Sequence, residues 1–93
     1  MLVGTLKIWF VLRESHSLKD KRRIVKGLKQ RLFNRFRVAV AEVDHQDTWQ
    51  RATLGVAAVG NDGDQLNAVL SKVVDAVRNV GGAELLDYEL EMF

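Results

Sequence analysis

The chain has 93 residues and no cysteine, with 47% hydrophobic residues, 28% charged residues and a net charge of +2. This composition is typical of a small globular protein and excludes a disulfide framework, a thiolate metal site and a cysteine nucleophile. We expect a single domain over residues 1–93 in a reducing compartment, with the cytoplasm as the default.

The N-terminal stretch alternates in character. Large apolar side chains occupy most even positions from Leu2 to Leu12, while Thr5 and Lys7 lie between them. This period of two predicts a strand with one buried face. The stretch lacks a basic leader and a small-residue cleavage site, so we interpret it as a strand rather than a signal peptide. No segment reaches the roughly 20 apolar residues of a membrane helix, and no membrane partner is expected.

A strongly basic helix should follow. Ser17, with Asp20 three residues later, resembles a capping box in which Asp replaces the usual Glu. The apolar stripe of this helix consists of Leu18, Ile24, Val25, Leu28, Leu32 and Phe36. The opposite arc consists of Lys19, Arg22, Arg23, Lys26 and Lys29. Residues 13–37 hold ten basic residues against two acidic ones, a balance of +8, whereas residues 38–93 hold three against ten, a balance of −7.

Three strands and a second helix complete the pattern. β-branched residues predict a strand over residues 38–43, and alternation predicts others over 50–59 and 83–92. The second helix should be capped by Asn61 or Asp62 and stop at Gly81-Gly82. The order βαββαβ predicts an α/β (α+β) ferredoxin-like sandwich, a four-stranded antiparallel sheet with both helices on one face.

Four segments of the chain are similar to those of a known family. They are Ser15 to Arg22, Val40 to Asp47, Trp49 to Arg51, and Glu84 to Glu89. Together they resemble the YlxP-like family of small bacterial proteins over nearly the whole chain. The resemblance implies a ferredoxin-like fold and a cytoplasmic bacterial protein whose genes are often found near translation and ribosome-maturation genes. It implies no established activity, and no catalytic residue or cofactor can be carried over from it.

The basic arc predicts the leading function, a non-catalytic RNA-binding module linked to ribosome maturation or translation. Phe33 falls within the arc, where an exposed ring could stack on a base or enter a partner. Arg35 and Arg37 are expected to extend the patch. The competing interpretation is a solvated helix face on which Phe33 packs against neighbouring loops.

The uncovered sheet face supports a different hypothesis. It carries Trp9 and Val11 on the first strand, small residues on the third and acidic residues on the last. One aromatic beside an acidic edge is a poor platform for RNA bases, whereas small residues suit close packing on another surface. The alternative function is therefore a protein-interaction or homodimerising domain that uses this face.

One polar segment has no explanation from its pattern alone. It contains the family motif residues Glu42, Asp44, His45 and Asp47, followed by Trp49 and Arg51. Carboxylates and an imidazole suit a hard metal or acid–base chemistry, but strand alternation need not bring them together. A metal-dependent enzyme or regulator here is a remote alternative, and we expect no metal or cofactor. The carboxylates could equally turn the chain or pair with the basic helix.

Two further motifs favour structural interpretations. His16 lies between Ser15 and Ser17, but adjacent residues rarely point at each other, and a loop and a helix cap explain both serines. The turn from Gly60 to Gly63 could offer N–H groups to an anion, yet its own acidic side chains would repel phosphate. We interpret that segment as a turn and helix cap.

Overall fold

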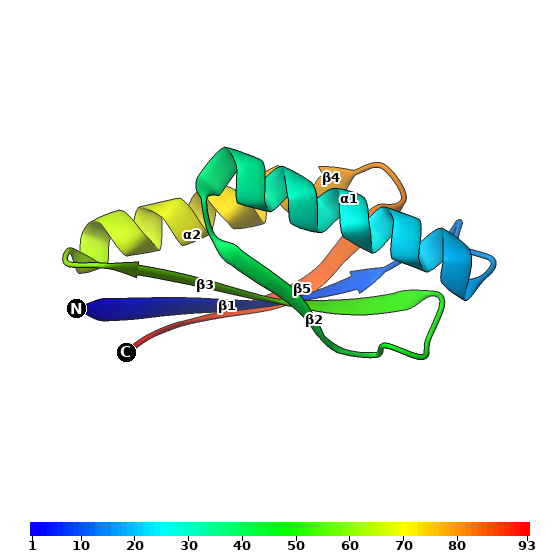
Figure 1. Ribbon diagram of the computed structural model, residues 1–93, viewed down its shortest axis with the longest axis horizontal. Coiled ribbons are helices and arrows are strands. Elements are labelled where there is room, and N and C mark those ends of the chain that lie inside the picture. The colour runs from blue at the N-terminus through cyan, green and yellow to red at the C-terminus, as the bar shows by residue number, and fades with distance from the viewer.

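The computed structural model describes residues 1–93, with residue 79 described by its backbone only. The elements are β1 (Leu2–Val11), α1 (Leu18–Phe36), β2 (Ala39–Asp44), β3 (Arg51–Gly60), α2 (Gly63–Val77), β4 (Asn79–Val80) and β5 (Ala83–Met92). Figure 1 shows both helices on one side of the sheet, whose other face carries no helix. Among the described residues, no helix is long and apolar enough to cross a membrane.

The sheet order is β2-β3-β1-β5-β4, and every neighbouring pair is antiparallel. The four long strands and two helices confirm the predicted ferredoxin-like sandwich. The expected end of the second helix was wrong, because α2 ends at Val77 and residues 79–80 form β4. Gly81 and Gly82 instead form the hairpin turn into β5, with Gly82 at φ +87°. A glycine pair is as typical of a hairpin as of a helix end.

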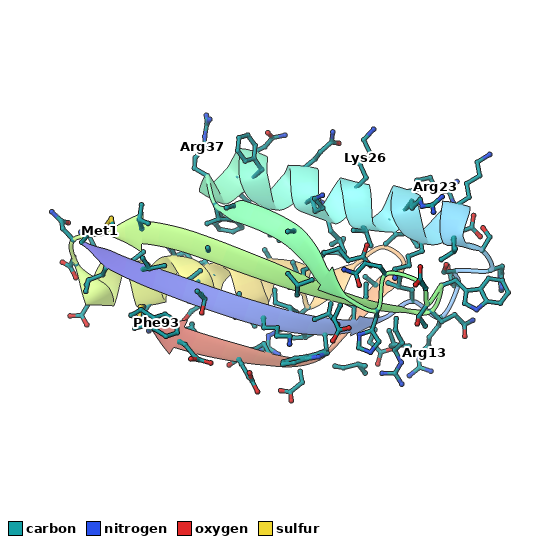
Figure 2. The ribbon with its side chains drawn as sticks, turned by 60° about the horizontal axis from the view of Figure 1, so that its bottom comes forward. Met1, Arg13, Arg23, Lys26, Arg37 and Phe93 are labelled. Atoms are coloured by element: carbon teal, nitrogen blue, oxygen red, sulfur yellow. The ribbon has the colours of Figure 1, made fainter. Side chains whose placement is uncertain are left out.

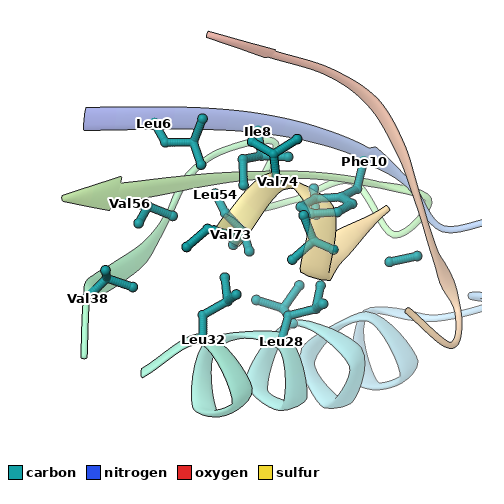
Figure 3. Close-up of a cluster of buried hydrophobic side chains, with 14 of the residues drawn as sticks. Leu6, Ile8, Phe10, Leu28, Leu32, Val38, Leu54, Val56, Val73 and Val74 are labelled. Atoms are coloured by element: carbon teal, nitrogen blue, oxygen red, sulfur yellow. The ribbon is translucent and has the colours of Figure 1, made fainter. Parts of the chain in front are cut away.

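The core lies between the helices and the inner face of the sheet (Figure 3). Leu6, Ile8 and Phe10 project from β1 towards both helices and are at most 1% exposed. Leu28 of α1 and Val73 of α2 pack in the same cluster. Each such side chain contributes about 1.5–3 kcal/mol by leaving water. Because all helical packing uses this face, the outer arc of α1 and the outer face of the sheet remain available for contacts.

Helix α1 is fixed at both ends by side-chain and backbone geometry. The Ser17 Oγ accepts a hydrogen bond from the Asp20 backbone N–H at 3.0 Å, and Asp20 Oδ2 accepts one from the His16 N–H at 3.1 Å. The Ser17 half of the expected capping box is therefore present, whereas the Asp20 carboxylate binds the N–H of His16 instead of that of the N-cap Ser17. At the other end Arg37 is left-handed, with φ +56°, and its N–H donates to the Phe33 carbonyl at 2.9 Å. No glycine marks this end, although a left-handed arginine costs about 1–2 kcal/mol.

The last strand carries an irregularity that its sequence does not reveal. The β1–β5 register shifts between Trp9 and Phe10, so Leu85 lies opposite Phe10 while Leu86 is 45% exposed. The alternation predicted over residues 83–92 would place Leu86 on the same face as Tyr88 and Leu90, and it was wrong at that position. The bulge shifts the register by one residue, so odd-numbered residues of β5 face the core before it, as Leu85 does, and even-numbered residues face the core after it, as Leu90 does.

Candidate functional site

The basic arc of α1 lies on the solvent side of the helix. All five of its cations, Lys19, Arg22, Arg23, Lys26 and Lys29, are exposed. Figure 2 shows Arg23 and Lys26 projecting from α1 away from the sheet, with Arg37 beyond the end of the helix. Among the described side chains, Arg23 is the only one of the five with an ion pair, a 3.5 Å contact to Asp20 on the same helix. The positive charge of the arc is therefore largely free to meet an external anion.

Phe33 and the two arginines near the end of α1 have different positions. Phe33 is 55% exposed, so the expected ring on the basic arc is accessible. Arg35 follows it by two residues, which is about 200° around the helix, and points away from the arc. Its guanidinium lies 5.1 Å from the centre of the Phe36 ring. Arg37 is exposed at the helix end. The structure thus groups Phe33 with the basic arc and separates Arg35 from it.

A buried lysine joins α1 to the end of β2, and the sequence reasoning missed it. Lys21 is 1% exposed, and its Nζ lies 2.8 Å from Glu42 Oε2. Glu42 Oε2 accepts no aligned hydrogen bond among the described groups, so the contact is a charge pair. Lys21 Nζ also donates to the backbone carbonyl of His45. One signal was available, because Lys21 precedes Val25 by four residues and follows Leu18 by three, which places it within the apolar stripe.

The segment after Glu42 folds into a fixed turn. The β2–β3 register shifts between Glu42 and Asp44, and His45 is left-handed at φ +61°. The Asp44 carboxylate accepts a hydrogen bond from the His45 N–H at 2.9 Å. The His45 ring Nδ1 lies 2.7 Å from the hydroxyl of buried Thr53. These contacts hold the turn against the sheet. The backbone carbonyl of His45 accepts from Lys21, and the His45 ring contacts Thr53.

The titratable groups of this turn do not assemble a metal site. Glu42 faces Lys21, and Asp44 binds its own neighbour's backbone, while Asp47 is exposed. Among the described residues no group of three His, Cys, Asp or Glu side chains could hold a metal ion. The contacts instead give this segment a structural role. Through Lys21, Glu42 and Thr53 they join helix α1 to strands β2 and β3.

The loop before α1 also makes hydrogen bonds to the end of the β2–β3 loop. Gln50 accepts a backbone hydrogen bond from Leu12 at 2.9 Å, and its side chain donates to the Ser15 carbonyl at 3.3 Å. The hydroxyl of buried Ser15 donates to the Ser17 carbonyl at 3.2 Å. The serines are therefore used in a loop contact and a helix cap. Trp49 is half-exposed and Arg51 is exposed at the edge of this loop.

The outer face of the sheet carries an open hollow of about 570 Å³. It is lined by residues of all four long strands, with small side chains at Ala39, Ala41, Gly55 and Ala57. Gly55 lies close beneath Val43, because a Cβ atom on it would lie 2.8 Å from Val43 Cγ1 and the valine side chain would have to shift. Trp9 does not line this hollow, and its ring lies 5.2 Å from the Lys7 ammonium. Val11 lines a second, smaller hollow beside Arg13 and Glu84.

Comparison with known proteins settles the family. Residues 3–90 match the family described as "Protein of unknown function (DUF503)". The chain is 34% identical over 73 residues to "Uncharacterized protein YlxP" of Bacillus subtilis, which covers 78% of this chain and 79% of the relative. The chain belongs to this YlxP-like family. The two longest segments that carry the resemblance, residues 15–22 and 40–47, are the ones that Lys21 and Glu42 join.

Among solved structures, the chain is similar to a variant of SnoaB, a cofactor-independent oxygenase from Streptomyces nogalater. The TM-score is 0.48 with 14% sequence identity, over 99% of this chain and 90% of the other.

Proposed function

We propose that this protein is a non-catalytic RNA-binding module of the cytoplasm that contacts RNA through the outer arc of α1. The observation that supports the proposal most directly is the row of exposed cations on α1, which carries one weak ion pair among the described side chains. A solubilising surface normally mixes both signs of charge, whereas this arc carries one.

The dimensions of the arc suit a nucleic-acid strand. Lys19 and Lys29 are ten residues apart, which is about 15 Å along a helix. With the spacing of one strand of duplex DNA as a guide, roughly 3.4 Å of axis per phosphate, the row spans about four phosphates. Phe33 lies one turn beyond Lys29 and is 55% exposed, where its ring can stack on an unpaired base.

The acidic residues of β5 favour the same face for RNA binding. Exposed acidic residues of β5 are Glu84, Asp87, Glu89 and Glu91. Of these, Glu84 pairs with Arg13 at 2.8 Å, and that contact raises the pKa of Arg13 above its ordinary value through the hydrogen bond and the nearby charge. A polyanion is repelled by this edge and attracted by α1, so the charges favour one docking face.

The test is the affinity of the protein for a structured ribosomal RNA fragment, chosen because of the translation context that the family resemblance implies. Fluorescence anisotropy across a salt series should show log affinity falling with log salt. The R22E/R23E variant should bind at least tenfold more weakly, and its salt slope should flatten by about 1.4–1.8, because two phosphate contacts are lost.

The matched control is K72E/R78E, which makes the same change in net charge on exposed positions of α2 and its C-cap. This control should keep its affinity within about threefold. Phe33→Ala should weaken binding to single-stranded RNA more than to duplex RNA, because duplex bases offer no free face. If R22E/R23E and K72E/R78E weaken binding equally, attraction by total charge explains the affinity, and α1 is not the binding face.

A second candidate function is protein interaction through the open sheet face. One observation favours it, since three of the exposed large apolar side chains, Val43, Val59 and Phe93, belong to that face. A sheet that leaves apolar side chains in water gains stability when another surface covers them.

A further inference from the structure

The outer sheet face is divided lengthwise into a low half and a high half. The low half is formed by β2 and β3, whose outward residues at the centre are Ala39, Ala41, Gly55 and Ala57. The high half is formed by β1 and β5, whose outward residues at the same levels are Thr5, Lys7, Glu89 and Glu91. The hollow of about 570 Å³ therefore lies beside a ridge of longer side chains.

We propose that a second copy of this chain covers the face, related to the first by a two-fold axis that runs nearly parallel to the strands between β1 and β3. This operation places β1 over β3 of the second copy and β5 over its β2. The high half of each copy then lies over the low half of the other. A two-fold interface must be complementary to itself in this way, because the same surface is used twice.

The strand registers specify which side chains meet. Lys7 lies opposite both Gly55 and Glu89, and Gly55 lies opposite Ala41, so these residues share one level across the sheet. The two-fold axis keeps the level and exchanges the sides. Glu89 therefore faces Ala41 of the second copy, and Lys7 faces its Gly55. Each long side chain meets the space above a small residue.

The positions of the acidic side chains favour this axis over the alternative. An axis across the strands would place β5 over β5, with Glu89 and Glu91 against their own counterparts, and like charges in contact destabilise an interface. With the axis along the strands, Glu91 lies at the level of Ala39 of the second copy, through Thr5 and Ala57. The two Lys7 side chains then lie on either side of the axis at one level, about one strand spacing apart, so one pair of like charges remains at the centre of the interface.

The face is large enough for a stable pair. Four strands of up to ten residues span about 33 Å by 19 Å, which gives about 600 Å² a copy. The total of about 1,200 Å² reaches the lower limit of specific interfaces and predicts a concentration-dependent dimer. The apolar residues Val43, Val59 and Phe93 are 47%, 67% and 68% exposed in the single chain. Their cover requires no rearrangement of α1, whose basic arc stays on the outside.

Chemical cross-linking tests the arrangement, since the natural chain has no cysteine. Positions 41 and 89 are three strand spacings apart in one copy, about 14 Å, whereas facing Cα atoms of two packed sheets are about 10 Å apart, which is still too far for a disulfide. In the proposed dimer positions 41 and 89 face each other. A short bis-maleimide that spans the gap between the two sheets should therefore join the A41C/E89C variant into a covalent dimer, while A41C alone and E89C alone should not be joined.

Sedimentation velocity over a range of concentrations supplies the second readout. The unmodified protein should sediment as a dimer at high concentration, and Ala41→Arg should weaken the dimer at least tenfold while circular dichroism keeps the native spectrum. A chain that stays monomeric at several hundred micromolar overturns the proposal, and cross-linking of E89C alone overturns the axis. Neither result bears on RNA binding by α1, which uses the opposite side of the molecule.

Discussion

Replacing Lys21 by methionine should destabilise the protein more than any other single change of a charged residue on α1. The substitution keeps most of the side-chain volume and removes the ammonium that lies 2.8 Å from Glu42 Oε2. It also leaves the His45 carbonyl without its donor. Loss of one partner of a buried ion pair costs about 3–5 kcal/mol. The Glu42 side chain keeps 22% exposure, so hydration recovers part of this, and we expect a loss of about 2–4 kcal/mol.

The assay is urea unfolding followed by tryptophan fluorescence, with Trp9 on the sheet and Trp49 in the β2–β3 loop as reporters. At about 1–2 kcal/mol per molar urea for a chain of this size, the midpoint should fall by about 2 M. The control is Lys26→Met, at an exposed position of the same helix, and should change the free energy of unfolding by no more than about 0.5 kcal/mol.

The double variant K21M/E42M distinguishes a paired charge from simple packing. Because two apolar side chains of similar volume leave no buried charge, the double variant should recover most of the loss seen in K21M. A loss below about 1 kcal/mol in K21M, or a double variant less stable than K21M, would refute the role that we assign to the pair.

Two further changes test the turns at either side of the sheet. Thr53→Val keeps the shape of a buried side chain but removes the hydroxyl 2.7 Å from the His45 ring. Thermal unfolding should therefore show that the free energy of unfolding falls by about 1 kcal/mol. An unchanged free energy would mean that the ring is held only by packing. Gly82→Ala introduces a Cβ at a residue with φ +87°, 3.2 Å from Ile24, so the melting temperature should fall by about 4–8 °C. The control is Gly81→Ala, because a Cβ at Gly81 meets open space, and it should lower the melting temperature less.

Regular elements of the fold were predictable because their patterns repeat. The even positions of β1 and the apolar stripe of α1 each extend over ten or more residues, so single exceptions do not hide the period. The capping role of Ser17 was equally readable, since the hydrogen bond to Asp20 is local. The prediction from local sequence failed at Gly81-Gly82. A glycine pair is compatible with either a helix end or a hairpin turn, and tertiary packing decides which of the two forms.

The residues of the candidate site also differ in how far the sequence predicts their surroundings. Exposure of Arg22, Arg23 and Phe33 follows from their place on the helix, and could be predicted. The environment of Lys21 depends on Glu42, which is 21 residues away on another element, and on a register shift that no periodicity announces. A lysine within an apolar stripe is a recognisable signal, but its partner becomes known only when the strand position is known.

The edges of the sheet have a consequence for the solution behaviour of the protein. At one edge, the bulge after Glu42 and the left-handed His45 interrupt the row of free backbone groups on β2. At the other, the hairpin strand β4 covers the start of β5, and Asp87, Glu89 and Glu91 follow along the remainder. Irregular backbone and repeated charge both oppose the addition of another strand. Growth into fibrils by edge-to-edge pairing is therefore disfavoured at both edges of the sheet, even while apolar side chains such as Val43 and Val59 stay exposed on its broad face.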